Sequence, residues 1–300
     1  MEKKKIRFII NPVSGVGKKK NIILLIEQHI DKNKFQYEIV YTQKEGHAIS
    51  LSKQAADNNY FAVVAVGGDG SINEVGSSLI GTNTALAIIP VGSGNGFANH
   101  FHIPHNISKA INLINTGKVI SVDTIAANDR KVIGICGIGF DAHVAHVFAN
   151  YGKRGLSSYI KIILKEYFKY KPFVYKILVE DKVVEKKAWL ITFANASQFG
   201  NNANINPWAD IQDGILEICI LKKMSLLKIP KIIYFMYANK MDQLSFFEII
   251  RTKSATLFNS ENHILHIDGE PVTLGTTVFF NINSLSLKVI VPNNFQENIS

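Results

Sequence analysis

The residues best placed to do chemistry form a glycine-rich turn directly after a short apolar run and directly before a helical pattern: Gly67, Gly68, Asp69, Gly70 and Ser71. Glycines let backbone amides approach phosphate oxygens, and the start of a helix adds partial positive charge. An acid and a hydroxyl in the same turn can orient a sugar, a metal ion or a substrate. The turn therefore predicts a nucleotide-phosphate cradle, although Asp69 or Ser71 could also serve simply as a helix cap.

Two loops of similar composition follow other expected strands. One holds Gly92 and Ser93 within residues 90–97, and the other runs from Asn11 to Gly15. Ligands of open α/β sheets gather beyond the carboxyl ends of the strands, so the loops are expected to face one triphosphate. The loop at 90–97 could also be a plain connector. The spacing of the first loop matches neither a P-loop nor a dinucleotide-binding fingerprint.

The elements that must position these loops alternate along the first third of the chain. Helices with apolar residues at three- and four-residue spacing are expected over 19–30 and 48–58, and a third over 72–79. Such alternation with strands is typical of a parallel sheet covered by helices on both faces, a doubly wound α/β fold. The expected buried strands are residues 6–10, 37–41, 61–66 and 85–89.

After Asp123 the pattern changes to many short strand-like runs, which predict an antiparallel β-sandwich. The chain is therefore expected to divide into residues 1–124, an α/β nucleotide-binding domain, and residues 125–300, a β-sandwich domain. The last run, 286–291, could close either domain. The expected strands are 132–136, 174–179, 189–194, 215–221, 263–267 and 277–282, and the expected helices are 157–170 and 225–239.

Composition narrows the class of protein. With 300 residues, 47% of them hydrophobic, the chain can bury two cores, and large-scale disorder is disfavoured. A net charge of +9 predicts an anionic partner without choosing between nucleotide, nucleic acid and an acidic membrane surface. The longest apolar run, 229–241, is interrupted by proline and lysines and is too short to span a bilayer. Two cysteines without paired spacing, and no signal sequence, predict a cytoplasmic location.

The second half of the chain also contains two acidic turns. Asp268, Gly269 and Glu270 form one, and residues 210–216 form the other. By residue type, each is an ordinary Asp-Gly turn more often than a site. A carboxylate on such a turn can accept the proton of a hydroxyl during phosphoryl transfer, a reaction that otherwise needs aligned groups and neutralised phosphate oxygens.

Three motifs in chain order resemble the diacylglycerol kinase catalytic family, especially its bacterial lipid kinases. Asn11 to Gly15 is similar to the family's Asn-Pro-x-Ser-Gly opening, Thr42 with residues 46–48 to its Thr-x-x-x-Gly-His-Ala segment, and residues 67–71 to its Gly-Gly-Asp-Gly-Thr signature. The resemblance implies ATP as the phosphoryl donor and Asp69 as a catalytic residue that holds phosphate or metal. The nucleotide contacts that it implies are Asn11, Ser14, Thr42, Gly67, Gly68, Asp69, Gly70, Ser71, Gly92 and Ser93.

The resemblance extends through the second half of the chain. Residues 137–142 are similar to the start of the family's sandwich domain, and Asp268 to Glu270 resembles its late Asp-Gly-Glu motif. That motif implies Glu270 as the catalytic proton acceptor. Residues 210–216 resemble an Asp-Gly-x-Leu element that binds Mg²⁺ in bacterial members. The ligands that it implies are the carboxylate of Asp213 and the backbone carbonyls of Asp210 and Ile215.

The resemblance predicts an ATP-dependent lipid kinase but not the lipid. Asn95 and Gly96 stand where many diacylglycerol kinases have Asn-Asp, and residues 92–95 are similar to the Gly-Ser-Gly-Asn form common in sphingosine kinases. Diacylglycerol, a sphingoid base and other acylated alcohols stay open as acceptors. NAD kinases share the Gly-Gly-Asp-Gly turn, so phosphorylation of a soluble nucleotide is one alternative. A nucleotide-binding protein without enzymatic activity is the other.

A lipid kinase must reach its substrate at a membrane surface. Lysines mix with aromatic and aliphatic residues over 161–171 and 226–240, which predicts peripheral docking through one of these segments. Each could instead be an amphipathic helix packed on the sandwich. Basic residues are not interleaved with stacking aromatics in any concentrated patch, so a nucleic-acid partner is not expected. The oligomeric state is left open, a homodimer included.

Overall fold

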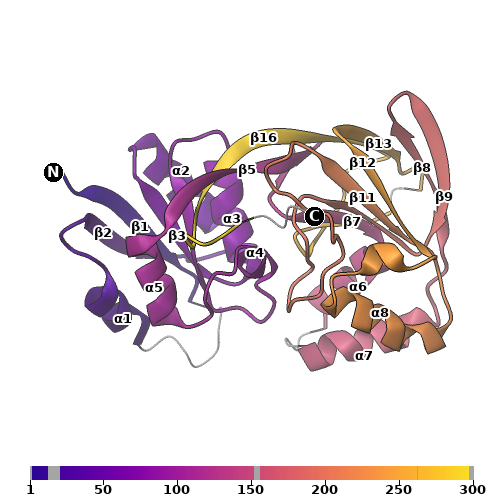
Figure 1. The fold of residues 1–300 in the computed structure, drawn as a ribbon, viewed down its shortest axis with the longest axis horizontal. Helices are drawn as coiled ribbons and strands as arrows, with labels where there is room; N and C mark the ends of the chain where they lie inside the picture. Colours follow the sequence, from indigo (N-terminus) through magenta and orange to yellow (C-terminus); the bar gives the residue numbers. More distant parts are fainter. Residues whose placement is uncertain (1, 13–20, 152–155, 262, 297–300) are drawn as a thin grey trace. The chain divides into compact units, whose positions relative to one another are not determined.

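The computed structural model describes residues 2–12, 21–151, 156–261 and 263–296. The chain forms two compact units. The first contains residues 1–123 together with 284–299, and the second contains residues 124–283. The first unit is built on a parallel sheet with helices and the second on antiparallel sheets, which confirms the predicted fold class (Figure 1).

The first unit is built on parallel strands in the order β2-β1-β3-β4. These strands are short runs rich in β-branched and other apolar residues, as buried parallel strands require. The strands are β1 (Lys4–Ile10), β2 (Phe35–Tyr41), β3 (Ala62–Gly67) and β4 (Ala85–Pro90), and the helices are α1 (Ile22–His29), α2 (His47–Asp57), α3 (Asp69–Leu79), α4 (Gly96–His100) and α5 (Ile107–Thr116).

Helices cover both faces of this sheet because alternate side chains of each strand point to opposite sides. Phe8 and Val64 belong to a buried cluster with Ile26 of α1 and Ile111 of α5. On the opposite face, the Arg7 guanidinium donates hydrogen bonds to a backbone carbonyl and a glutamine side chain of α2, at 2.7 and 2.9 Å. The carboxyl ends of β1 to β4 therefore lie at one edge, where the loops that follow them meet.

The second unit is an antiparallel sandwich of two sheets. One sheet has the order β12-β11-β10-β7-β14-β15, and the other joins β16, β13, β8 and β9, with β5 beside β16 and β6 beside β5. The strands are β5 (Lys118–Ala127), β6 (Arg130–Val132), β7 (Ile135–Gly139), β8 (Phe173–Val179), β9 (Lys182–Ala188), β10 (Leu190–Ala194), β11 (Leu216–Leu221), β12 (Phe247–Thr252), β13 (Ser254–Phe258), β14 (Leu265–Ile267), β15 (Glu270–Val272) and β16 (Thr277–Val291). The helices are α6 (Phe140–Ala149), α7 (Leu156–Tyr167), α8 (Ile229–Tyr237) and the short 3-10 turns η2 (Leu226–Lys228) and η3 (Met241–Gln243).

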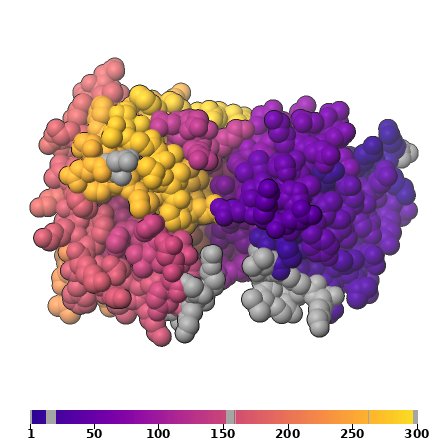
Figure 2. Space-filling view, turned by 180° about the vertical axis from the view of Figure 1, so that it is seen from behind, coloured from indigo at the N-terminus to yellow at the C-terminus, as the bar shows by residue number. Residues whose placement is uncertain are grey.

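Two apolar layers stabilise the second unit. Between the sheets, Phe193 of β10 and Phe280 of β16 stack with their ring centroids 3.7 Å apart, in a cluster that includes Ile218 and Leu257. On the outer face of the six-stranded sheet, a second buried cluster contains residues of α6, α7 and α8. The sheet that contains β16 joins strands far apart in the sequence, since β13 pairs with both β8 and β16. In the space-filling view, residues of these segments (salmon and yellow) lie side by side (Figure 2).

Strand β16 belongs to both units. The sequence pattern predicted two strands, at 277–282 and 286–291, but the structure has one continuous strand of 15 residues. Its first part pairs with β13 and its last part runs parallel to β4. The second unit therefore ends near Asn283 instead of at the C-terminus, and the end of the last strand lies in the first unit.

The aromatic stack between the sheets predicts a contrast between two adjacent residues of β16. Phe280→Ala should lower the free energy of unfolding of the second unit by about 3 to 5 kcal/mol, because it removes a buried ring and leaves a cavity. Phe279→Ala should cost less than about 1 kcal/mol, because that side chain is 55% exposed. Urea unfolding followed by tryptophan fluorescence measures both, since Trp189 and Trp208 lie in the second unit. Equal losses would contradict the assignment of the core face.

Candidate nucleotide-binding and acceptor sites

Asp69 is the first residue of α3, and it joins the glycine-rich turn to the loop after β4. Its carboxylate accepts hydrogen bonds from the backbone amides of Asn95 and Gly96, both at 2.7 Å. These amides begin α4, where negative charge is favourable. Burial raises the pKa of the Asp69 carboxyl, and the two amides oppose that rise. A half-buried carboxylate therefore holds the two phosphate-binding candidates together.

The two loops approach each other so closely that only glycine fits at position 92. A Cβ on Gly92 would lie 2.5 Å from the Cα of Gly68 and 2.8 Å from Oδ1 of Asn95. The Asn95 side chain closes the loop, because it accepts a hydrogen bond from the Gly92 amide at 3.1 Å and donates one to the Gly92 carbonyl at 2.9 Å. The glycines are thus needed for packing between the loops as well as for any approach to phosphate.

The segments after β1 and β2 reach the same edge of the sheet. Asn11 follows β1, and its side chain donates a hydrogen bond to Oγ of Ser71 at 3.1 Å. Thr42 follows β2 and is buried, with its backbone amide donating to the Ile10 carbonyl at 3.0 Å. The structure therefore brings Asn11 and Ser71 into contact and places Thr42 at the end of the adjacent strand.

The other predicted nucleotide contacts lie at the junction of β3 and α3 or in the loop after β4. Gly67 ends β3, and Gly68 and Gly70 flank the start of α3. The N-cap residue of α3 is Gly68, which has no side chain to cap the helix, and the start of such a helix can bind a phosphate. Ser93 is exposed. Ser14 lies outside the described residues.

Glu74 of α3 was not predicted from the sequence. Its carboxylate accepts hydrogen bonds from the amides of Gly46 and Ala48, at 3.0 and 3.2 Å, at the start of α2. A signal for it was present, because α2 begins after Gly46 and has no Ser, Thr, Asp or Asn at the cap position. Its first amides must find an acceptor elsewhere in the fold. Helix α3 therefore also holds the segment that contains His47.

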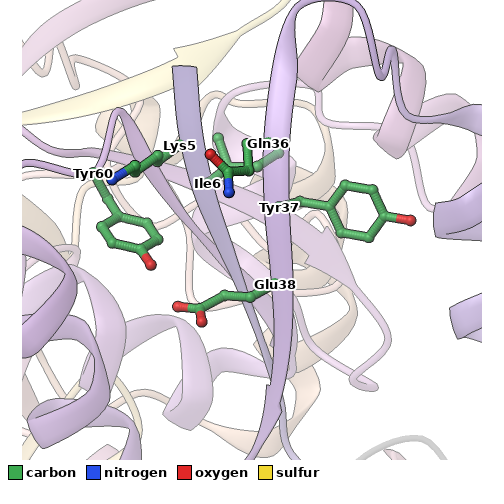
Figure 3. A pocket seen from close by; sticks show the side chains of 6 residues that line it. All are labelled: Lys5, Ile6, Gln36, Tyr37, Glu38 and Tyr60. Atoms are coloured by element: carbon green, nitrogen blue, oxygen red, sulfur yellow. The ribbon is translucent and has the colours of Figure 1, made fainter. Parts of the chain in front are cut away.

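A hollow of about 140 Å³ on the first unit is a separate feature (Figure 3). Arg7 forms an ion pair with Glu38. Burial raises the pKa of Tyr60, and Glu38 adds to that rise. Because Lys5 and Gln36 stand near the N-terminal ends of β1 and β2, the hollow is not at the carboxyl edge of the sheet. Its lining residues are Lys5, Ile6, Gln36, Tyr37, Glu38 and Tyr60.

In the second unit, Glu270 begins β15 directly after a two-residue turn. Asp268 and Gly269 have φ values of 48° and 90°, as in the type I′ turns that join hairpin strands. The Asp268 carboxylate accepts hydrogen bonds from three successive amides, those of residues 133–135, at 2.8 to 3.2 Å. Glu270 itself is exposed. The turn therefore fixes the backbone at Glu270 while the residue stays open to solvent.

The predicted metal loop contains an ion-pair network. Asp213 accepts hydrogen bonds from the Ile215 amide at 2.8 Å and from the Arg251 guanidinium at 2.5 Å. Arg251 also donates to Glu217 at 3.2 Å, and Asn206 donates to the same carboxyl at 3.1 Å. Burial, with the nearby charge of Asp213 as the second cause, raises the pKa of Glu217 to about 7. Glu217 was not among the predicted residues.

The donor set of this loop suits only a largely hydrated Mg²⁺ ion. In the part of the chain that the structure describes, no three acidic, histidine or cysteine side chains converge as a metal site. Mg²⁺ commonly keeps several waters and binds through one or two carboxylates. The Asp213 carboxylate and the carbonyls of Asp210 and Ile215 could therefore hold such an ion. Arg251 shares the same carboxylate and would compete with it.

A second hollow, of about 430 Å³, lies on the second unit beside the end of α7. Acidic and basic side chains both line this hollow. A hydrogen bond from His143 at 3.0 Å, together with Lys169, lowers the pKa of Glu166. The lining residues are His143, Glu166, Lys169, Tyr170, Lys171 and Phe173.

Both units match known protein families. Residues 5–127 match the diacylglycerol kinase catalytic domain, and residues 134–291 match the YegS C-terminal NAD kinase beta sandwich-like domain. The chain belongs to the bacterial diacylglycerol kinase and YegS-like lipid kinase family. The family resemblance predicted from the sequence motifs is thereby confirmed.

Individual relatives are similar to this chain over different lengths. A diacylglycerol kinase of Staphylococcus saprophyticus is 24% identical over 98% of this chain and 97% of its own length. An uncharacterized protein of Synechocystis is 26% identical over 90% of this chain, which covers 62% of that protein. The crystal structure of a diacylglycerol kinase from Bacillus anthracis aligns with a TM-score of 0.72, at 21% identity, over 97% of this chain and 98% of that chain, and so shares its fold.

The contacts of Asp69 predict a local effect of its removal. In Asp69→Ala, the amides of Asn95 and Gly96 should exchange with solvent at least about tenfold faster, because charge-assisted hydrogen bonds contribute about 1.5 to 3 kcal/mol. Hydrogen exchange read by mass spectrometry or NMR measures this. Ser78→Ala, a variant at the other end of α3, serves as the control. Unchanged protection at both amides would contradict the proposed link between the loops.

Proposed function

We propose that this chain transfers the γ-phosphoryl group of ATP to a hydroxyl of a membrane lipid, such as diacylglycerol or a sphingoid base. One observation carries the proposal: the half-buried Asp69 carboxylate holds the loop after β4 against the start of α3. Backbone amides at adjacent strand ends are thereby collected at one edge of a parallel sheet, as phosphate binding requires. The diacylglycerol kinase family, to which the chain belongs, uses ATP.

The chemistry needs one proton acceptor and neutralised phosphate oxygens. In the proposed reaction the Glu270 carboxylate takes the proton of the lipid hydroxyl, whose oxygen forms a new bond to the γ-phosphorus as the bond to ADP breaks. The first-turn amides of α3 and the side chains of Asn11 and Thr42 bind the nucleotide. Asp213, with the carbonyls of Asp210 and Ile215, would hold Mg²⁺, which stabilises nearby negative charge when bound.

NAD is the second candidate acceptor. It is favoured by one observation, the match of residues 134–291 to a sandwich domain described as NAD kinase-like. Incubation with radiolabelled ATP and, in parallel, diacylglycerol, a sphingoid base or NAD separates the two proposals. We expect label in a lipid product. Label in the NAD sample alone would overturn the lipid kinase proposal in favour of the second candidate.

Replacement of the proposed proton acceptor should affect catalysis more than binding. Glu270→Gln should lower kcat by roughly 10² to 10⁴, the usual contribution of general base catalysis, and leave the Kd for ATP unchanged. Steady-state kinetics and calorimetric titration with ATP measure the two quantities. The control is Glu261→Gln, which changes an exposed glutamate of the same unit. A kcat within a factor of two of the parent enzyme would exclude Glu270 as the base.

The membrane contact of this enzyme is proposed to be the outer surface of α7 and α8. Both helices pack inward through one buried cluster, so their exposed residues face away from the sheet. On α7 and just beyond it, Ile160, Leu164 and Phe168 recur at four-residue spacing, and Phe168 is 72% exposed. Tyr234 and Tyr237 are exposed on α8. The exposed lysines on and beside these helices include Lys161, Lys165, Lys169, Lys228 and Lys231.

Exposed apolar side chains among lysines suit a membrane with anionic lipids, where the apolar groups enter the interface and the lysines stay at the headgroups. In the segments that the structure describes, no helix is long and apolar enough to cross a bilayer. Contact through this outer surface is therefore proposed to be peripheral.

Two charge substitutions on this surface test the proposal. Phe168→Glu/Tyr234→Glu should weaken binding to vesicles of phosphatidylglycerol and phosphatidylcholine by roughly tenfold or more, because it replaces apolar area with charges of the same sign as the membrane. Vesicle cosedimentation gives the affinity. Val174→Glu/Val183→Glu, two exposed positions on β8 and β9, adds the same charge elsewhere. An equal loss in both variants would show that net charge, and not this surface, sets the affinity.

A further inference from the structure

A buried polar pair interrupts the apolar outer face of the six-stranded sheet. Thr192, Gly137 and His266 stand side by side on β10, β7 and β14. Asp141 of α6 lies against them, with Oδ2 at 3.1 Å from Nε2 of His266 and 3.4 Å from Oγ1 of Thr192. His266 is 3% exposed and Asp141 is 9% exposed. Burial of such groups costs free energy, so their retention calls for an explanation.

The backbone beside this pair leaves no space for any other side chain. A Cβ on Gly137 would lie 2.3 Å from Oδ2 of Asp141 and 2.3 Å from Nε2 of His266. The imidazole and the carboxylate therefore occupy the volume that a side chain on the central strand would need. The pair is built into the sheet and is not a chance contact of surface groups.

The hydrogen bonds determine which nitrogen of His266 carries the proton. Nδ1 accepts a hydrogen bond from the Gly269 amide at 3.3 Å, so it has no proton of its own. The proton is therefore on Nε2, which donates to Asp141. The other tautomer, or a protonated ring, would place an N–H group against the Gly269 amide. Asp141 thus selects the tautomer that can bind Gly269.

Gly269 immediately precedes Glu270. We infer that His266, oriented by Asp141, is a positioning residue that fixes the turn carrying Glu270, in addition to the Asp268 contacts. The inference rests on the proposed role of Glu270 as proton acceptor. An acceptor carboxylate must be aligned with the hydroxyl, and a misplacement of about 1 Å can cost roughly 10² in rate.

Two replacements of His266 separate its two contacts. His266→Asn keeps an acceptor near the place of Nδ1, whereas His266→Gln reaches towards the place of Nε2 and loses the acceptor for Gly269. We expect kcat to fall roughly tenfold or more in His266→Gln and by less than about threefold in His266→Asn, with the Kd for ATP unchanged in both. A role in packing alone would not discriminate between them in this order.

Asp141→Asn tests the selection of the tautomer. The Ala142 amide donates to Oδ1 of Asp141 at 2.8 Å, so the new side chain should keep its oxygen there and turn its NH₂ group towards His266. The ring must then accept at Nε2 and carry its proton on Nδ1, against the Gly269 amide. Asp141→Asn is therefore expected to lower kcat to the same extent as His266→Gln.

Amide exchange gives a readout that does not depend on activity. The Gly269 amide should exchange at least about tenfold faster in His266→Gln and Asp141→Asn, and at the parent rate in His266→Asn and in the control His146→Gln, which changes an exposed histidine of α6. Tryptophan fluorescence of each variant confirms that the second unit is folded.

Equal losses of kcat in the two His266 variants, or unchanged exchange at Gly269 in all variants, would overturn the inference. Full activity of Glu270→Gln would remove the proposed role of Glu270, and the positioning role with it. In that case the exchange data would still report whether His266 binds the turn, so the two failures can be told apart.

Discussion

The carboxyl edge of the parallel sheet in the first unit depends on one carboxylate, that of Asp69. This carboxylate accepts hydrogen bonds from the two amides that begin α4. A helix of five residues cannot satisfy its own first amides, and a half-buried carboxylate gains from donors, so each group stabilises the other. Glu74, on the same helix, does the same for the first amides of α2. Helix α3 thus holds the starts of two other helices through its acids.

The second unit uses the same kind of interaction on a hairpin. Asp268 accepts hydrogen bonds from three successive amides, those of residues 133–135 where β7 begins, and His266 accepts one from the amide of Gly269. Acids that stand out in the motifs therefore divide into two groups. Asp69 and Asp268 bind the protein's own backbone, whereas Glu270 is exposed. This division agrees with the proposal that Glu270 accepts the proton while the acids of the first group order the backbone around the two sites.

Sequence patterns located the four parallel strands β1 to β4 to within about two residues, because each central parallel strand is a continuous apolar run bounded by polar residues, but they missed β5. They also placed the glycine-rich turns at strand ends. They could not predict the partners of Asp69, Glu74 or His266. Most of these partners lie 26 to 125 residues away in the sequence, and the nearer one lies in a turn whose geometry depends on the sheet. The family motifs marked Glu270 but gave no signal for the histidine four residues before it.

The edge strands of the second unit were missed for a different reason. Strand β9 is mostly lysine, glutamate and valine, and it lacks a run of buried residues, since it borders the sheet and needs charge to discourage pairing with other chains. The single strand β16 was read as two because Asn283 and Ser284 resemble a turn. In the structure the backbone continues through them, and the Leu285 amide donates to Asp123 at 2.6 Å.

The path of β16 has a consequence for synthesis of the chain on the ribosome. The last part of this strand is the neighbour of β4 in the first unit, yet it is translated only after the whole second unit. At about 5 to 20 residues per second, the free edge of β4 waits on the order of 10 to 40 s for its partner. An unpaired strand edge invites association with other chains. The nascent protein therefore carries its greatest aggregation hazard while its N-terminal half is already complete in all but one strand.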